Sequence, residues 1–352
     1  MKKVITLIAC VALVVAMFAG CAGGQPAASS SAPASSEAAA SSSAPASSEA
    51  AASSAPAESG KVYKVAYIAR AQSDSFAAWL CNEIKQEAAK YKDISLEVFD
   101  GEANDDKENT MIENAIANKF DAIIVQANNG EAQRPYIEKI VAAGIKCITT
   151  NPRVSDIKGA SSVDAQPYDQ GAANAKAAVD QVPKNAKVVV LNGPPGNFHS
   201  TERRKSWQAE FFDKRPDVKI LAEDTANWNK DEAMKKMEDW VIAYGAIDAI
   251  ISMNDNMCAG ALEVVGDKDQ YKNILSYGVD GTAEACLLIQ QGKMTSTALQ
   301  SAIDLAQLNL QTVHQLLTGE KTEVSVDIPA PLINKANADE YVKMYTDRGL
   351  IK

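Results

Sequence analysis

The chain has 352 residues, of which 46% are hydrophobic and 23% charged, and its formal net charge is −10 with acidic and basic residues interspersed. No dense block of lysine and arginine, the pattern that neutralises phosphates, occurs in it, so nucleic acid is not an expected partner. The six cysteines and two histidines show no CxxC or Cys/His spacing typical of a metal site. We therefore expect no metal and no other cofactor.

Residues 1–20 have the layout of a secretory signal peptide, with two early lysines, an apolar run that ends at Phe18 and a small pair before Cys21. The apolar run falls short of the about 20 residues that span a bilayer, so a permanent transmembrane helix is the minor interpretation. The tetrad FAGC at 18–21 resembles a bacterial lipobox, in which Cys21 receives a lipid. Phe18 replaces the usual leucine, and ordinary cleavage before an accidental cysteine is the alternative. We expect export to the outer face of the cytoplasmic membrane or the periplasm, with membrane contact only through the lipid.

Residues 21–60 consist almost entirely of alanine, serine, proline, glutamate and glycine, and the segment APASSEAAASS at 32–42 recurs at 44–54. Such a composition cannot bury enough apolar surface to offset the entropy of ordering the chain. We expect a disordered tether between the lipidated cysteine and the folded part.

From residue 61 onward the composition is globular, and the length exceeds what one hydrophobic core usually serves. Short apolar, β-branched runs alternate with amphipathic helical stretches, a pattern that indicates parallel α/β sheets. In the first half the expected strands are Val62–Ala69, Leu96–Phe99, Ala122–Gln126 and Ile145–Thr149, and the expected helices are Ser75–Tyr91, Lys107–Asn118 and Glu131–Ala143.

The alternation starts again after Asp164. The expected helices are Gln166–Gln181, Thr201–Lys214, Lys230–Tyr244, Met257–Val265, Ala283–Gln291 and Ile303–Leu317, and the expected strands are Lys187–Leu191, Val218–Ala222, Ala249–Ser252, Ile274–Gly278, Ser296–Gln300 and Val324–Ile328. The fold class is therefore α/β, with two doubly wound parallel-sheet lobes joined by a multi-strand hinge near Asp164, Gln300 and Ile328. We assign residues 61–163 and 301–327 to the N-terminal lobe, and residues 164–300 and 328–352 to the C-terminal lobe.

Ligands of parallel α/β sheets bind beyond the carboxyl ends of the strands, where this chain is unusually polar. Four motifs stand at such ends: GPPG at 193–196, DTANW at 224–228, MNDNMCAGALE at 253–263 and VDG at 279–281. In this order they resemble the periplasmic sugar-binding proteins of the ribose and glucose/galactose type, over about residues 62–331. The resemblance implies the type I periplasmic binding fold.

The resemblance also implies a ligand set, carried over residue by residue. Carboxylates, amides and a guanidinium exchange hydrogen bonds with vicinal hydroxyls, while aromatic rings cover C–H faces. The implied ligand-binding residues are Asp74, Phe76, Asn151, Asn197, His199, Arg203, Trp228, Asn254, Asp280 and Gln300.

Departures from both types limit the choice of ligand. Asn151-Pro152 replaces the Asp-Arg pair of the ribose type, Ala77 replaces its second phenylalanine, and His199 replaces an aspartate of the glucose/galactose type. The segment at 181–187, QVPKNAK, lacks the carboxylates of the glucose/galactose calcium loop, so no metal is expected there. A hexose such as galactose or glucose is the first choice, and a pentose, a cyclitol or a furanose remains open.

Structural roles compete with ligand binding at several of these residues. Asp74 is also placed to cap a helix, Arg203 to lie in solvent beside Glu202 or Glu210, and Trp228 to lie in the core. We expect Asp255 to cap the helix that begins at Met257.

The resemblance implies a monomeric substrate-binding lipoprotein, not an enzyme, that closes around a sugar or related polyol and delivers it to the permease subunits of an ABC importer. The sequence has no GxSxG, P-loop, GxGxxG or HExxH motif. Two alternatives are a receptor for chemotaxis or a sensor kinase and, less favoured, a secreted carbohydrate-active enzyme that uses Asp74 and Asp280 as acid and base. We expect Cys81, Cys147, Cys258 and Cys286 to be buried thiols, although export permits disulfides.

Overall fold

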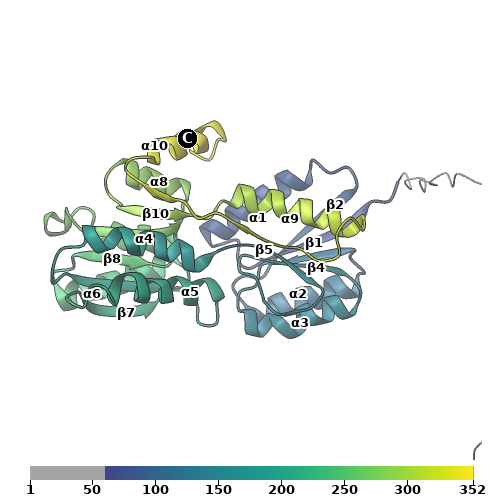
Figure 1. Ribbon diagram of the computed structural model, residues 1–352, viewed down its shortest axis with the longest axis horizontal. Helices are drawn as coiled ribbons and strands as arrows, with labels where there is room; N and C mark the ends of the chain where they lie inside the picture. Colours follow the sequence, from purple (N-terminus) through teal and green to yellow (C-terminus); the bar gives the residue numbers. More distant parts are fainter. Residues whose placement is uncertain (1–59, 352) are drawn as a thin grey trace, which may run out of the picture. The chain divides into compact units, whose positions relative to one another are not determined.

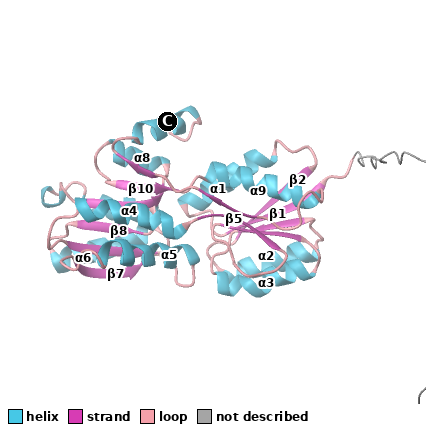
Figure 2. Cartoon of the chain, viewed as in Figure 1, coloured by secondary structure: helices cyan, strands magenta, loops and turns pink. Residues whose placement is uncertain are grey.

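The computed structural model describes residues 60–351, so the predicted signal peptide, Cys21 and almost all of the predicted tether lie outside the described residues. The strands of the described part gather into two six-stranded sheets flanked by helices (Figures 1 and 2). The fold is α/β with parallel sheets in both lobes, which confirms the predicted fold class.

The N-lobe is built on the sheet with strand order β11-β5-β4-β3-β1-β2. Its elements are β1 (Tyr63–Ala69), α1 (Ser75–Ala88), β2 (Ile94–Asp100), α2 (Asp105–Ala117), β3 (Ala122–Val125), α3 (Gly130–Ala142), β4 (Lys146–Thr150), β5 (Ala160–Ala165), α9 (Ala302–Leu317) and β11 (Ser325–Ile328).

Both faces of the N-lobe sheet are covered, because successive side chains of a strand point to opposite faces. Along β1, Val65 and Tyr67 join one apolar cluster with residues of α1 and α9, while Ala66 and Ile68 join another with residues of α2 and α3. Figure 1 shows α1 and α9 on one face of this sheet and α2 and α3 on the other. The continuous apolar run of β1 follows from burial on both sides.

The C-lobe is built on the sheet with strand order β12-β10-β9-β8-β6-β7, in which only β12 runs antiparallel to its neighbour. Its elements are α4 (Pro167–Gln181), β6 (Lys187–Asn192), α5 (Phe198–Trp207), β7 (Lys219–Thr225), α6 (Lys230–Tyr244), β8 (Ala249–Ser252), α7 (Asp255–Val265), β9 (Leu275–Asp280), α8 (Ala283–Gln290), β10 (Ser296–Leu299), β12 (Leu332–Asn334) and α10 (Ala338–Asp347). Gln208–Phe212 forms a π-helical turn after α5, and Asp269–Tyr271 forms a 3-10 turn.

The chain passes between the two sheets three times, after β5, after β10 and between β11 and β12. These passages follow Ala165, Leu299 and Ile328. The lobe boundaries given above, and motion about these passages, stay predictions.

The helix that was expected at Thr201–Lys214 begins earlier and ends earlier, as α5. Asn197 begins it, because its Oδ1 accepts hydrogen bonds from the backbone N–H groups of His199 and Ser200. His199 therefore lies in the first turn of the helix and not in the preceding loop. Strands β5 and β12 and helix α10 were not predicted.

No helix within residues 60–351 combines the length and the apolar character needed to cross a bilayer. In the same part of the chain Cys81, Cys147, Cys258 and Cys286 are buried free thiols, as expected from their apolar segments.

Candidate ligand-binding site

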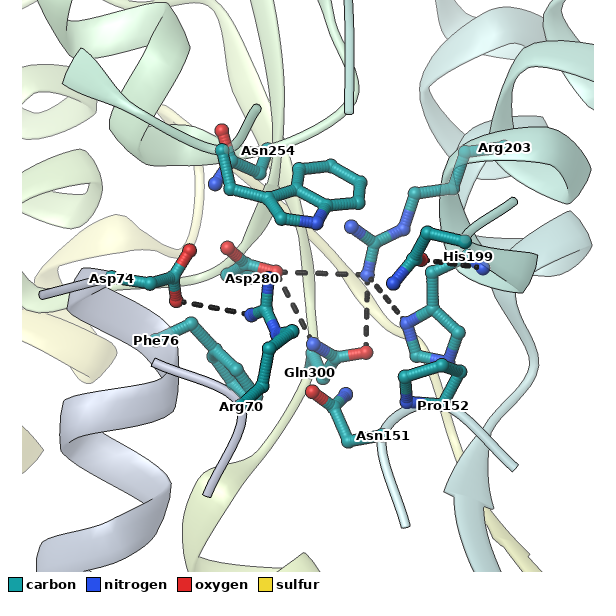
Figure 3. A pocket seen from close by; sticks show the side chains of 12 residues that line it. Arg70, Asp74, Phe76, Asn151, Pro152, His199, Arg203, Asn254, Asp280 and Gln300 are labelled. Atoms are coloured by element: carbon teal, nitrogen blue, oxygen red, sulfur yellow. Dashed lines mark hydrogen bonds and ion pairs between the residues drawn. The ribbon is translucent and has the colours of Figure 1, made fainter. Parts of the chain in front are cut away.

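A cavity with about 260 Å³ of empty space, part of it open to solvent, lies between the carboxyl ends of the N-lobe strands and those of the C-lobe strands. Figure 3 shows Asp74 and Arg70 on one side of it, Arg203 and His199 on the other, and Gln300 between them. The lining residues are Arg70, Asp74, Phe76, Asn151, Pro152, Asn197, His199, Arg203, Trp228, Asn254, Asp280 and Gln300.

Helix caps bring three of these side chains to the cavity, since a helix that follows a parallel strand begins where the strand ends. Asp74, Asn197 and Asn254 cap α1, α5 and α7, each by accepting from backbone N–H groups of the first turn. The short polar residues that terminate each strand are therefore held in fixed positions by the backbone of the next helix.

Asp74 both caps a helix and faces the cavity. Its Oδ1 accepts from the backbone N–H of Ala77 at 2.7 Å and lies 3.3 Å from Nη2 of Arg70. Its Oδ2 is buried and has no hydrogen-bond partner within residues 60–351. The capping role and the predicted binding role are thus carried by different oxygens of one carboxylate.

Arg203 occupies the centre of the C-lobe side and is 2% exposed, so the solvated interpretation of this residue is wrong. Its Nη1 donates to the Met253 carbonyl at 2.7 Å, and its Nε and Nη2 donate to Oε1 of Gln170 at 3.0 and 2.8 Å. Nη2 also donates to Oε1 of Gln300 at 3.0 Å. These bonds fix the plane of the guanidinium at the cavity wall.

Asp280 and Gln300 complete this network at the ends of β9 and β10. Gln300 Nε2 donates to Oδ1 of Asp280 at 3.3 Å, and the same oxygen lies 3.6 Å from Nη2 of Arg203. Burial raises the pKa of Asp280 well above its usual value, and the nearby charge of Arg203 opposes that rise. Arg203 offsets the effect of burial only in part, so the site favours the neutral form of this carboxyl.

Three lining residues, Asn151 with φ 42° among them, have backbone conformations that favour glycine. Asp280 has φ 126° and Trp228 has φ 60°. Such conformations cost of order 1–3 kcal/mol and persist where the surrounding structure imposes them, often at binding sites. At Trp228 this conformation accompanies an indole that lines the cavity while remaining only 5% exposed.

The Trp228 indole lies near two guanidinium groups. The Cζ atoms of Arg70 and Arg203 are 5.9 and 5.7 Å from its ring centroid. Phe76, 2% exposed, is the second aromatic residue of the cavity wall, and it comes from the opposite lobe. The two predicted stacking residues are therefore brought to one cavity from separate sheets.

On the N-lobe side Asn151 is positioned through Gln126, which follows β3. Gln126 Nε2 donates to Oδ1 of Asn151 at 3.1 Å, while Oε1 of Gln126 accepts from the backbone N–H of Arg70. Asn151 Nδ2 is left buried without a partner among the described residues.

Four buried polar atoms of the cavity wall thus lack a hydrogen-bond partner within residues 60–351: Arg70 Nε, Asp74 Oδ2, Asn151 Nδ2 and Trp228 Nε1. Buried polar groups in folded proteins are nearly always paired, and leaving one unpaired costs about 1–3 kcal/mol. Three donors and one acceptor around a small cavity therefore match a ligand that carries several hydroxyl groups.

All ten residues that were predicted to bind ligand line this cavity. That they bind a ligand stays a prediction, and two assignments change in detail. Asn254, not Asp255, caps α7. Asp255 is turned inward, where Oδ1 accepts from Thr297 and Oδ2 from the Thr282 backbone N–H, and burial raises its pKa to about 7.

Asn197 has both ends of its side-chain amide engaged. Its Oδ1 caps α5, and its Nδ2 donates across to the backbone carbonyl of Asn128 in the N-lobe at 3.1 Å. This residue links the two walls of the cavity.

Arg70 and Pro152 line the cavity but were not among the predicted residues. Arg70 is the first residue after β1, and a residue at that position lies at the carboxyl edge of the sheet. Its place directly after a strand is the sequence signal that indicates a binding residue. A neighbouring cavity of about 830 Å³ shares Arg70, Asp74 and Trp228 with the first and is also lined by residues of both lobes, including Asn128 and Pro194.

The fold has two α/β lobes, and a polar cavity lined in part by Phe76 and Trp228 lies between the strand ends of the two sheets. These features define a class of ligand-binding protein that encloses small solutes. A family model described as periplasmic binding protein domain matches residues 65–321. The chain belongs to this family, as a type I binding protein of the sugar- and polyol-binding kind that serves ABC importers outside the cytoplasm. Its relatives are binding proteins and not enzymes.

Relatives and solved structures agree with this placement. The chain is 27% identical over 248 residues to a xylitol-binding protein of Mycolicibacterium smegmatis, covering 70% of each chain. It is 24% identical over 279 residues to the ribose import binding protein of Bacillus subtilis, covering 79% of this chain and 90% of the relative. The crystal structure of a Caulobacter myo-inositol binding protein with bound myo-inositol matches with a TM-score of 0.75 and 25% identity, over 80% of this chain and 97% of the other.

Proposed function

We propose that this chain captures a small, uncharged monosaccharide or related polyol in the cavity between its lobes and delivers it to the permease of an ABC importer. A hexose such as galactose or glucose, the first choice from the sequence, belongs to this proposed set. We also propose that a lipid on Cys21 holds the protein at the outer face of the membrane.

The observation that carries the proposal is the chemistry of the cavity wall. Two guanidinium groups, Arg70 and Arg203, lie 3.3 and 3.6 Å from the carboxyl groups of Asp74 and Asp280, so each arginine of the wall already faces an acidic side chain. An isolated ligand charge would leave the wall unbalanced, and burying an unbalanced charge is costly. The unpaired donors and acceptor described above, with Phe76 and Trp228, suit hydroxyl groups and the C–H faces of a ring.

The relatives support the same ligand class, since those named above bind xylitol, ribose or myo-inositol. All three compounds are neutral and densely hydroxylated. They differ in the number of hydroxyl groups and in the carbon skeleton, since xylitol is an open chain while ribose and myo-inositol form rings, so this support extends to the class of ligand and not to one compound.

The division of the wall between two lobes suggests how capture works. The N-lobe supplies Arg70, Asp74, Phe76 and Asn151, and the C-lobe supplies Arg203, Trp228 and Asp280. A ligand that contacts both sets has higher affinity for the closed arrangement than for an open one, and this differential affinity drives closure. The Asn197 to Asn128 hydrogen bond is one contact that such closure forms.

A thermal-shift screen of the full chain tests the proposal, because a ligand that binds only the folded state raises its melting temperature. The panel consists of myo-inositol, xylitol, D-ribose, D-glucose and D-galactose, with D-galacturonate and glutamate as charged compounds. We expect a shift from at least one neutral polyol, its loss in Arg203→Met and its retention in Arg204→Met, whose guanidinium pairs with Glu223 at the surface. Shifts from the charged compounds alone would refute the proposed ligand class.

A further inference from the structure

Asp164, which was expected only to mark the hinge, is a fully buried carboxylate whose two oxygens both act as acceptors. Oδ1 lies 2.9 Å from Nε2 of His199 and accepts from the Ala165 backbone N–H at 2.8 Å. Oδ2 accepts from the backbone N–H of Arg153 at 2.7 Å and lies 3.4 Å from its Nε. Burial opposes the charge of Asp164, but His199 and Arg153 outweigh it and lower the pKa of this carboxyl.

The other nitrogen of the His199 ring contacts the arginine at the centre of the cavity wall. Nδ1 of His199 lies 3.3 Å from Nη2 of Arg203. An arginine only donates hydrogen bonds, so Nδ1 has to be the acceptor and Nε2 has to carry the proton that it donates to Asp164. The contacts therefore define one tautomer of a neutral imidazole.

The charges around His199 agree with a neutral ring. Burial lowers its pKa, Asp164 on β5 opposes that effect, and Arg203 on its own helix and Arg70 after β1 add to it. Both ring nitrogens are engaged, which leaves neither free for a ligand hydroxyl. His199 was expected to contact ligand directly, and this geometry favours an indirect role.

We propose that Asp164 is a positioning residue of the binding site, which acts through His199 to orient the guanidinium of Arg203. Asp164 belongs to a strand of the N-lobe sheet, whereas His199 and Arg203 belong to α5 of the C-lobe. The relay Asp164–His199–Arg203 therefore adds a contact that originates in the N-lobe sheet to a guanidinium that Gln170 and Met253 also hold within the C-lobe. The identity of the ligand that the Arg203 guanidinium binds rests on the proposed function. The relay itself does not depend on that identity.

The relay predicts that the isosteric change Asp164→Asn is not conservative. If the amide turns its NH₂ toward His199, the imidazole must carry its proton on Nδ1, where it meets the N–H groups of Arg203. If the amide turns its NH₂ toward Arg153, two donors meet at the position where Oδ2 now accepts at 2.7 Å. Either orientation leaves a buried donor unpaired.

Nitrogen-15 NMR of the histidine rings in the full chain tests this directly, because the chain has only two histidines. In a His314→Gln background the remaining ring signals belong to His199; His314 is a partly exposed residue of α9 that lies away from the cavity. We expect a neutral ring protonated on Nε2 at pH 7, and loss of that single tautomer in Asp164→Asn. A wild-type ring protonated on Nδ1 or on both nitrogens, or an unchanged tautomer in Asp164→Asn, would overturn the relay.

Affinity for myo-inositol and D-ribose provides the second readout. Asp164→Asn and His199→Asn should each lower the affinity about tenfold, the effect of leaving one buried donor unpaired. Since both changes break the same relay, the double variant should also lose about tenfold and not about a hundredfold. A hundredfold loss would contradict the relay. If neither compound binds the wild type, the proposed function fails for these ligands, and the ring tautomer still decides the relay.

Discussion

Gly193 and Trp228 lie so close together that a Cβ built on Gly193 would be 2.2 Å from Cζ2 of the indole. Gly193 follows β6, and Trp228 follows β7, the strand that pairs with β6. The absence of a side chain at 193 therefore determines where the indole of the cavity wall can lie.

Gly193→Ala should displace the Trp228 indole and weaken binding of the polyols in the panel by about tenfold or more. Displacing a well-packed aromatic ring forces neighbouring side chains out of their preferred rotamers and costs about 1–3 kcal/mol. Tryptophan fluorescence and calorimetric titration measure the two effects. Gly130→Ala is the matched control, since its Cβ would meet only Val154 at 3.7 Å. Equal affinity in Gly193→Ala and the wild type would show that the ligand does not use the indole.

Arg70→Lys should weaken ligand binding by about tenfold although the charge is kept. Lysine cannot reproduce a planar fork that lies beside Trp228 and also faces Asp74 at 3.3 Å, and a lost hydrogen bond to a charged group is worth about 1.5–3 kcal/mol. Calorimetric titration gives the affinity, and Arg134→Lys on α3, outside the cavity wall, is the control. Full affinity in Arg70→Lys would mean that Arg70 contributes only charge.

Asn197→Asp separates helix capping from closure. Aspartate caps a helix as well as asparagine does, so the cap is kept, and any fall in the free energy of unfolding should come only from the carboxyl placed at this buried position. The carboxylate cannot donate to the Asn128 carbonyl, now 3.1 Å away, so the closed arrangement and the ligand affinity should weaken. Urea denaturation and calorimetric titration measure the two quantities. A large fall in stability with unchanged affinity would reverse this assignment.

Glu108 makes stability depend on pH. Burial and the nearby Asp105 raise its pKa, the Asn128 backbone N–H and Arg70 oppose the rise, and the net pKa is about 8. Between its unfolded pKa near 4.5 and about 8 the folded state holds a proton that the unfolded state has lost, so stability falls as pH rises through this window.

Glu108→Gln should therefore be more stable than the wild type at pH 9, by on the order of a few kcal/mol, and should show a flatter profile between pH 5 and 8. Urea midpoints across this range provide the measurement. Glu113→Gln, an exposed position of the same helix, should leave the profile unchanged. Parallel profiles for Glu108→Gln and the wild type would show that Glu108 is charged in the fold.

Cys21→Ser should release the protein from the membrane fraction, because a seryl side chain cannot carry the proposed thioether-linked lipid. Fractionation of cells that express each variant measures the effect. Ala22→Ser, one residue further on, should remain membrane-associated. Retention of Cys21→Ser in the membrane would refute anchoring at this residue.

Much of the fold could be predicted because its signals are local. The buried strands are continuous apolar runs, such as Ala122–Val125, and the helices begin at capping residues such as Asp74. The lining residues follow from topology, since parallel strands deliver the residues after them to one edge of each sheet.

The missed elements depend on distant contacts. Helix α10 is short, but its Tyr345 is buried against Trp79 of α1, with ring centroids 5.5 Å apart, and donates to the Gly281 carbonyl at 2.5 Å. Arg348, just after α10, lies 3.2 Å from Glu83 of α1. Partners more than 60 residues away in the chain stabilise this helix, and no pattern within its own ten residues reveals them.

The roles of Asp255 and His199 in and near the site could not be predicted from the sequence either. The choice of Asn254 over Asp255 as the cap of α7 is decided by Thr282 and Thr297, which draw Asp255 inward. The role of His199 depends on Asp164, which lies in the other lobe's sheet. Both outcomes arise from tertiary contacts.

The central claim is that one ligand is held by both lobes. Calorimetric titration of the full chain tests this claim most directly, with the polyol that gives the largest thermal shift as the ligand. The titration compares the wild type with Asp74→Asn and Asp280→Asn. These isosteric changes each convert one carboxylate to an amide, in one lobe each, and Asp304→Asn on α9 is the exposed control. We predict one ligand per chain, recovered chemically unchanged, and an affinity loss of about tenfold or more in both site variants but not in the control. Full affinity in either site variant, or conversion of the ligand to a product, would contradict the account.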